Sequence, residues 1–352
     1  MNKDGKCRLS QHEHFYRMMT HELKAIFTKY QEVSAIGLKS VLATVVALEG
    51  SSYRRPGVRM LLIENGEMVG AVSGGCVEKE IARQAESVFK TGLAKVMEYD
   101  GRYRLGCEGI LHILLESFSP DNHFLEVFWD VITNRETFSI LSVFDKTNSE
   151  NKGFGSTFRF EKKEIPLNTE QEYCGGHSFE QTLFPCFRLI IIGAEHDAVL
   201  LCQYASLMGW EVTVVANPKE EKTSEAFPGI HAWLPKEPET LTFPMDKQTA
   251  VIVMTHSFAK DLGYLLALKD SNPAYLGLLG PMQRREKLFD ALLERYPEIS
   301  EDFLDSVHGP AGLDIGAETP QEISISIVSE ILTVIRQKNP VLLKEKLGKI
   351  HN

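Results

Sequence analysis

The stretch with the clearest chemical potential is Ser73-Gly74-Gly75-Cys76-Val77-Glu78. Residues 68–72, just before it, predict a short buried strand. Apolar residues at helical spacing follow the stretch and predict a helix that ends at Gly92. Two adjacent glycines permit a strand-to-helix turn whose successive N–H groups point into one concavity and can bind an anion. Cys76 lies at the positive end of the helix dipole, which favours a thiolate able to act as a nucleophile or bind a soft metal. The alternative is a tight turn with an inert, buried cysteine.

A second polar stretch, Gly50-Ser51-Ser52-Tyr53-Arg54-Arg55-Pro56-Gly57, follows an apolar run at 41–48 that predicts a buried strand. The guanidinium groups of Arg54 and Arg55 offer planar donor forks, and the two serines offer short donors, so this loop can bind a phosphate. The alternative is a solvated loop whose arginines pair with surface acids. Asn65-Gly66, between two apolar runs, predicts a hairpin that leads to Ser73.

A second glycine-flanked cysteine occurs in Leu105-Gly106-Cys107-Glu108-Gly109, before an apolar run at 110–115. Cys76 and Cys107 can converge on one ligand, or they can belong to two independent turns. Sequence separation leaves both interpretations open.

Strands alternate with helical segments from residue 187 onwards, which predicts a doubly wound, mostly parallel sheet. Its first turn, Gly193-Ala194-Glu195-His196, resembles a dinucleotide-binding fingerprint with two defects. Glu195 brings bulk and negative charge where a glycine would let a pyrophosphate approach. Asn217 stands at the end of the second strand, where an acid would hold the ribose. Both defects weaken an NAD(P) site, although Asn217 can still make a polar ribose contact.

Polar residues at other strand ends of this sheet are expected to face the ligand crevice. His256 ends the third strand, and His308 and Asp314 belong to a Gly/Pro-rich loop before the last helix. The alternative for each is a structural group with satisfied hydrogen bonds. Thr319, followed three residues later by Glu322, predicts a capping box at the start of that last helix.

Length and composition indicate a globular protein of two domains: 352 residues, 43% hydrophobic and 24% charged, with a formal net charge of −10. We place the domains at 1–167 and 185–352, with a linker at 168–184 because that stretch is polar and lacks clear periodicity. The acidic balance argues against nucleic-acid binding. A charged N-terminal stretch and the lack of a membrane-spanning run predict a cytoplasmic protein. Six cysteines with no CxxC pair argue against a disulfide framework or structural zinc.

Taken together, these motifs resemble the xanthine dehydrogenase accessory proteins, the XdhC/CoxI family. The resemblance rests on the 50–57 loop, the 73–78 turn, Leu105-Gly106-Cys107, Gly193-Ala194 with His196, Met254-Thr255-His256, residues 275–280, and residues 308–317 with Thr319-Pro320. It implies an α/β fold with an N-terminal mixed α/β XdhC/CoxI-type domain and a C-terminal Rossmann-like, doubly wound parallel-sheet domain.

The resemblance also implies a function: binding molybdenum cofactor (molybdopterin), supporting its sulfuration with a cysteine desulfurase, protecting it, and inserting it into an apo molybdenum hydroxylase such as xanthine dehydrogenase. A cofactor-insertion factor is expected rather than a xanthine dehydrogenase, because the chain has no iron–sulfur cysteine pattern and is too short for the hydroxylase. A homodimer is expected. The alternatives are an NAD(P)-dependent oxidoreductase acting through the second domain, and a protein–protein scaffold.

Several residues are assigned to the cofactor on this basis. The cofactor phosphate suits the Gly74-Gly75 amides and the Arg54-Arg55 pair, and molybdenum suits a thiolate. Cys76 is the predicted metal ligand, and Cys76 and Cys107 are the predicted chemically active residues. Glu108 replaces a family glycine after Cys107, which makes that loop less able to close on an anion. The full predicted cofactor-binding set is Ser51, Ser52, Arg54, Arg55, Ser73, Gly74, Gly75, Cys76, Gly193, Asn217, His256, His308 and Asp314.

Overall fold

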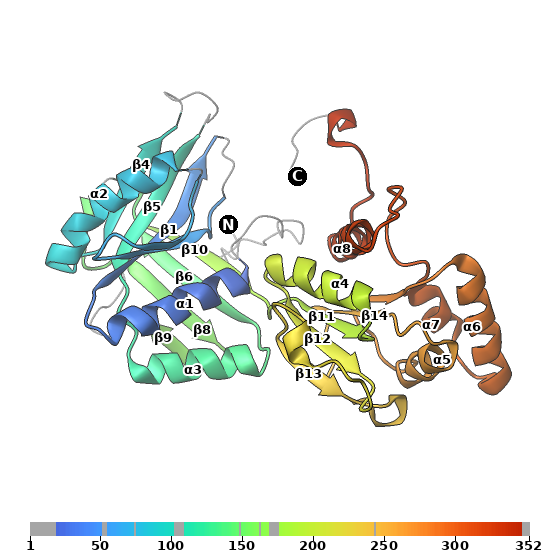
Figure 1. Cartoon of the computed structure of the whole chain (residues 1–352). Coiled ribbons are helices and arrows are strands. Elements are labelled where there is room, and N and C mark those ends of the chain that lie inside the picture. The colour runs from blue at the N-terminus through green and yellow to red at the C-terminus, as the bar shows by residue number, and fades with distance from the viewer. Residues whose placement is uncertain are drawn as a thin grey trace, which may run out of the picture. The chain divides into compact units, whose positions relative to one another are not determined.

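The structure is a computed structural model that describes residues 19–50, 55–73, 75–101, 109–147, 149–161, 163–168, 176–242 and 244–346. The chain divides into two compact units, one extending to Pro185 and the other beginning at Cys186 (Figure 1). Among the described residues, every helix is too short or too polar to cross a membrane.

The first unit contains two antiparallel sheets. The six-stranded sheet has the order β3-β2-β1-β5-β4-β7, formed by β1 (Ser40–Glu49), β2 (Arg59–Ile63), β3 (Met68–Gly70), β4 (Lys95–Asp100), β5 (Ile110–Ser117) and β7 (Ser149–Glu150). The four-stranded sheet has the order β10-β6-β8-β9, formed by β6 (Phe138–Phe144), β8 (Gly155–Phe160), β9 (Lys163–Pro166) and β10 (His177–Leu183). The helices are α1 (Thr20–Ser34), α2 (Cys76–Thr91) and α3 (Asn122–Thr133).

Both faces of β1 are buried, as its apolar run predicts. On one face, Val41, Ala43 and Val45 pack with Ile81 and other apolar residues of α2. On the other, Leu42 belongs to an aromatic-rich core with α1, α3 and the four-stranded sheet. Helix α2 is therefore held against the six-stranded sheet by its apolar face, which fixes where its first residue lies.

Two expectations for the first unit need correction. The interval predicted as a linker contains β10, which pairs with β6 from His177–Phe144 to Leu183–Phe138. The strand escaped notice because it buries few side chains, and one of them is Gln181 rather than an apolar residue. Residues 68–72 do not form a buried strand: β3 ends at Gly70 on the edge of the sheet, and Met68 is 46% exposed.

The second unit has the predicted doubly wound sheet, and all its strand pairs are parallel. The order is β13-β12-β11-β14-β15-β16, formed by β11 (Arg188–Ile192), β12 (Glu211–Ala216), β13 (Ala232–Pro235), β14 (Thr249–Val253), β15 (Tyr275–Leu278) and β16 (Val307–His308). The chain winds outwards from β11 and then resumes on its other side at β14. This reversal is the topological switch point at which such sheets bind ligands.

Helices cover both faces of that sheet. α4 (His196–Leu207) and α8 (Pro320–Ile335) pack on one face, and α5 (Phe258–Ala267), α6 (Met282–Arg295) and α7 (Glu301–Ser306) pack on the other. Short 3₁₀ turns lie at Ser224–Ala226, Pro238–Thr240 and Leu343–Glu345. The predicted capping box of α8 is confirmed, because the Glu322 N–H donates to Thr319 Oγ1 at 3.3 Å and the Thr319 N–H donates to Glu322 Oε2 at 2.9 Å.

Candidate functional site

The predicted strand-to-helix turn is present in the first unit. Helix α2 begins at Cys76, and its N-cap, Gly75, has a φ of 117°, a left-handed conformation that favours glycine. The helix ends as predicted at Gly92, whose φ is 72° and whose N–H donates to Val88 O at 2.8 Å. Gly74 and the Cys76 side chain lie outside the described residues.

The amides of this turn bind a carboxylate from the same chain. The N–H groups of Ser73 and Gly75 both donate to Glu78, the second at 2.8 Å, and Ser73 Oγ donates to Glu78 Oε2 at 2.6 Å. Partial burial acts to raise the pKa of Glu78, but these hydrogen bonds outweigh it and hold the pKa below its usual value. A phosphate that uses the same amides must therefore compete with Glu78.

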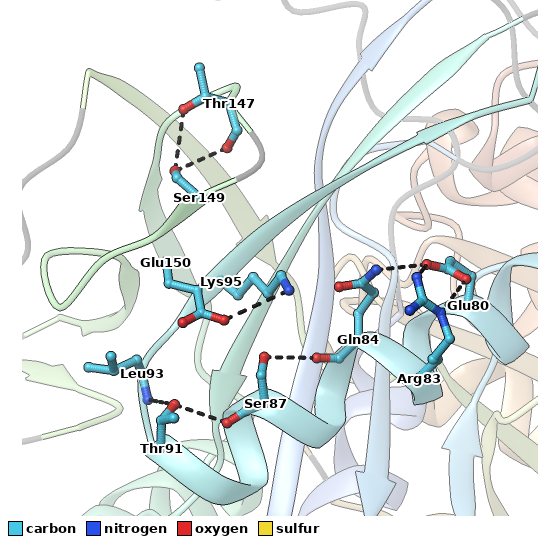
Figure 2. Close-up of polar contacts among 10 residues, drawn as sticks. All are labelled: Glu80, Arg83, Gln84, Ser87, Thr91, Leu93, Lys95, Thr147, Ser149 and Glu150. Carbon is cyan, nitrogen blue, oxygen red and sulfur yellow. Dashed lines mark hydrogen bonds and ion pairs between the residues drawn. The ribbon is translucent and has the colours of Figure 1, made fainter.

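On the outer face of α2, polar side chains three or four positions apart bond to one another (Figure 2). Arg83 Nε donates to Glu80 Oε2 at 3.0 Å, and Gln84 Nε2 donates to Glu80 Oε1 at 2.8 Å. Exposed pairs of this kind contribute only tenths of a kcal/mol each, roughly 0.3–0.5. Packing of the apolar face therefore does most to position Cys76.

Of the predicted phosphate loop, the structure describes Gly50 and residues 55–57, whereas Ser51, Ser52 and Arg54 lie outside the described residues. Cys107, in the other predicted cysteine loop, also lies outside them. Arg55 is half-buried. The loop closes at Gly57, whose N–H donates to Val45 O at 2.8 Å and whose carbonyl accepts from Arg59 Nη1 at 3.0 Å. Arg59 Nη1 also donates to Gln181 Oε1 of β10. The loop is thus anchored to the four-stranded sheet through Arg59.

Arg59 was not singled out from the sequence, yet it is only 1% exposed and its Nε and Nη2 have no hydrogen-bond partner among the described residues. Burial lowers the pKa of its guanidinium to about 10, and the nearby Glu116 carboxyl opposes that shift. Glu116, on β5, is fully buried and accepts from the Ser156 N–H at 2.9 Å and from Ser156 Oγ at 2.6 Å. Burial raises the pKa of Glu116 to about 7 despite these bonds. The sequence signal that could have identified Glu116 is that it is an acid directly after the apolar run 110–115.

In the second unit, Gly193 makes the tight turn after β11. Its φ is 133°, and a Cβ there would lie 2.4 Å from Met254 O, so only glycine fits. Glu195 is the N-cap of α4, and its carboxylate lies 3.7 Å from Lys222 Nζ. Lys222 Nζ also donates to Ala194 O at 2.6 Å.

Asn217, at the end of β12, binds an acid that reaches it from the neighbouring strand. Its Nδ2 donates to both carboxylate oxygens of Glu237, at 3.1 and 3.2 Å, while its Oδ1 accepts from the Lys219 N–H at 2.9 Å. Glu237 follows β13 and was not predicted. The dinucleotide-binding pattern expects an acid at the end of β12, the strand that follows the Gly193 turn. Glu237 follows β13 instead, so that pattern does not identify it.

The two predicted histidines each contact a carboxylate. His256 follows β14 with a φ of 57°, and its Nε2 lies 3.2 Å from Asp197 Oδ2. His308, at the end of β16, has its Nδ1 3.0 Å from Glu330 Oε1. Glu330 also accepts from the Tyr275 hydroxyl and from the Gly312 N–H, the latter at 2.7 Å.

These contacts define the state of the Glu330 carboxyl. Burial alone would raise its pKa, but the bonds from His308, Tyr275 and Gly312 prevail and hold the pKa below its usual value. Burial, with Glu330 beside it, raises the pKa of the Tyr275 hydroxyl. Glu330 therefore holds the loop after β16 against α8, and Asp314 of that loop is exposed.

The structure thus places Gly193, Asn217 and His256 at C-terminal strand ends, as predicted. His308 was predicted in a loop but ends β16, a strand of two residues that is too short to show a pattern in the sequence. Asn217, His256 and His308 each contact a carboxylate that the sequence pattern did not predict: Glu237, Asp197 and Glu330, respectively. Within the described chain, no group of three or more His, Cys, Asp or Glu side chains is arranged to hold a metal ion.

The all-parallel sheet, its strand order and the glycine turn after β11 make the second unit a Rossmann-like domain. Residues 189–331 match the family model described as the XdhC Rossmann domain, and residues 35–100 match the one described as the XdhC and CoxI family. The chain belongs to the XdhC and CoxI family.

Relatives match both units. A protein of Bacillus subtilis, named as a probable xanthine dehydrogenase subunit, is 29% identical over 322 residues, covering 84% of this chain and 92% of the relative. The "Molybdenum cofactor insertion chaperone PaoD" of Escherichia coli is 23% identical over 335 residues, covering 92% of this chain and 93% of the relative. A crystal structure described as a xanthine dehydrogenase from Bacillus halodurans has a TM-score of 0.74 at 26% identity, covering 92% of this chain and 97% of that one.

Proposed function

We propose that this protein is a maturation factor for a molybdenum hydroxylase of the xanthine dehydrogenase type. It binds molybdenum cofactor, supports its sulfuration, protects it and inserts it into the apo enzyme. The observation that carries the proposal is the likeness to PaoD, named a molybdenum cofactor insertion chaperone, over 92% of this chain and 93% of that protein. A match of this extent spans both units of the chain.

The proposed cargo site is at the 73–78 turn. The turn can bind an anion, because the amides of Ser73 and Gly75 already bind the Glu78 carboxylate. In the proposal, the cofactor phosphate displaces Glu78 and is held by those amides together with the Gly74 amide and the 50–57 loop. That loop supplies Ser51, Ser52, Arg54 and Arg55.

The cysteines have separate proposed roles. Cys76 binds the molybdenum atom, because it opens a helix and a thiolate is a soft ligand. Cys107 acts with Cys76 in sulfur transfer by carrying the sulfur transiently. A cysteine desulfurase supplies the sulfur, and the protein assembles as a homodimer. In the second unit, a second ligand surface is formed by Gly193, Asn217, His256, His308 and Asp314.

An NAD(P)-dependent oxidoreductase is the less favoured function. Glu195 occupies the fingerprint position at which a glycine would admit the pyrophosphate. The full-length likeness to an insertion chaperone gives the maturation role independent support.

The test is equilibrium binding of isolated molybdenum cofactor to the full chain. We expect Cys76→Ala and the double variant Arg54→Ala/Arg55→Ala each to weaken binding about 10-fold or more, about 1.4 kcal/mol. Arg83→Ala, on the exposed outer face of α2, is the matched control and should bind like the wild type. Absence of cofactor binding by the wild type would refute the maturation role, and unchanged affinity in both site variants would place the cofactor elsewhere.

A further inference from the structure

The C-terminal edge of the second unit's sheet carries a carboxylate at the place where Rossmann-like sheets hold ribose. Such sheets bind the ribose hydroxyls with an acid at the end of the strand that follows the glycine turn. That strand is β12, and it ends at Asn217, which has no negative charge. The Glu237 carboxylate lies within hydrogen-bond distance of the Asn217 amide, so an acid is present at this strand end after all.

The backbone that leads to Glu237 is held in place by two hydrogen bonds of the preceding residue. The N–H of the preceding residue, Lys236, donates to Ala216 O at 3.0 Å, and the Lys236 carbonyl accepts from the Tyr264 hydroxyl at 2.7 Å. The backbone before Glu237 is thus pinned to the last residue of β12 and to α5. The side chain then needs only the Asn217 amide to fix its direction.

The Glu237 carboxylate retains capacity to bind a ligand. A carboxylate has about four acceptor positions, and the Asn217 amide contacts each oxygen once. Glu237 is only partly buried, and no cation among the described residues forms an ion pair with it. Two neighbouring hydroxyls, such as those of a ribose, match the acceptors that are left.

The Lys222 ammonium group lies beside the Gly193 turn, where the phosphates of such a ligand would lie. Lys222 Nζ donates to Ala194 O, directly after Gly193, and lies 3.7 Å from the Glu195 carboxylate. Its charge offsets the negative charge that Glu195 brings to the N-terminus of α4. The feature of the turn that speaks most strongly against a phosphate is therefore partly neutralised by a neighbouring side chain.

We propose that the second unit binds a ribonucleotide carrying a diphosphate. Glu237, oriented by Asn217, accepts hydrogen bonds from the ribose hydroxyls, and Lys222 lies beside the phosphates at the Gly193 turn. This site requires no hydride transfer and is independent of the proposed molybdenum cofactor site in the first unit.

The test compares ADP with 2′-deoxy-ADP by calorimetric titration of the full chain. A site built to bind a hydroxyl discriminates against a ligand that lacks it, so the wild type should prefer ADP about 10-fold or more, since a hydrogen bond to a charged group is worth roughly that factor. Glu237→Gln should remove most of that preference. Glu239→Gln is the matched control, because Glu239 is an exposed carboxylate two residues away.

Lys222→Gln separates the two halves of the site. It should weaken ADP and 2′-deoxy-ADP by the same factor and leave their ratio unchanged. Glu237→Asp, which keeps the charge but withdraws it by one methylene, serves if Glu237→Gln does not fold. The proposal is overturned if the wild type does not bind ADP, if the Glu237 variants keep the ribose preference, or if Glu239→Gln loses it equally. Molybdenum cofactor binding, measured on the same variants, should be unaffected.

Discussion

The buried Glu116 carboxyl should make the stability of the first unit depend on pH near neutrality. Burial raises its pKa from 4.5 to about 7. The folded state therefore holds the proton more tightly than the unfolded state, so the free energy of unfolding falls as pH rises from about 4.5 through about 7. At about 1.4 kcal/mol for each tenfold difference in proton affinity, the loss amounts to about 3 kcal/mol. Arg59, with a pKa of about 10, stays charged throughout this range.

Glu116→Gln isolates the effect. The amide does not titrate, and it can keep both contacts with Ser156 by accepting from the N–H and donating to Oγ. Between pH 5 and pH 8 the wild type should lose about 2.5 kcal/mol of stability relative to this variant, because that range covers most of the titration. Glu98→Gln, at an exposed position on the adjacent strand β4, is the control and should follow the wild type.

The assay is urea unfolding followed by Trp129 fluorescence, because Trp129 lies on α3 of the first unit. Trp210 and Trp233 belong to the second unit and would add to the signal. The experiment therefore replaces both with phenylalanine in the reference protein and in each variant. If wild type and Glu116→Gln show the same change of stability with pH, Glu116 is ionised in the folded state and the reasoning from burial is wrong.

Three further predictions concern local chemistry. Gly193→Ala should lower the unfolding free energy of the second unit by about 2 kcal/mol or more in thermal unfolding, because its Cβ would meet Met254 O; an unchanged midpoint would contradict the turn geometry. Thr319→Ala should cost about 1 kcal/mol through loss of the α8 capping box, measured by urea unfolding, with Thr333→Ala near the end of α8 as comparison. Cys202 should resist maleimide at pH 8 in the native protein, since burial raises the pKa of its thiol to about 11, and rapid labelling detected by mass spectrometry would argue against that burial.

Short-range patterns in the sequence were enough to predict much of the fold. Apolar runs predicted β11, β12, β14 and β15, and the helices between them identified the parallel sheet. The α8 cap and the Gly92 end of α2 depend on residues three or four positions apart. Such patterns are visible in the sequence because the interacting groups are neighbours on one helix or strand.

The candidate sites were predicted only in part. The positions of strand ends correctly brought Asn217 and His256 to one edge of a sheet, since parallel strands must all end there. His308 lies at the same edge, but on the two-residue strand β16 rather than in the predicted loop. Their carboxylate partners were missed. Ser51, Ser52, Arg54, Gly74 and Cys107 lie outside the described residues, so their proposed cofactor contacts stay predictions from the sequence.

What the sequence determined by itself was the alternation of strands and helices in the second unit, the turns at Gly75 and Gly193, and the family. What only the tertiary structure decided was which distant groups meet: Arg59 with Gln181, 122 positions apart, and Asn217 with Glu237 across two strands. The physical reason is that a buried charge or amide must find a partner in space wherever the chain supplies one. Pairing of β12 with β13 brings Glu237 to Asn217, whereas Arg59 and Gln181 meet because the two sheets of the first unit pack together.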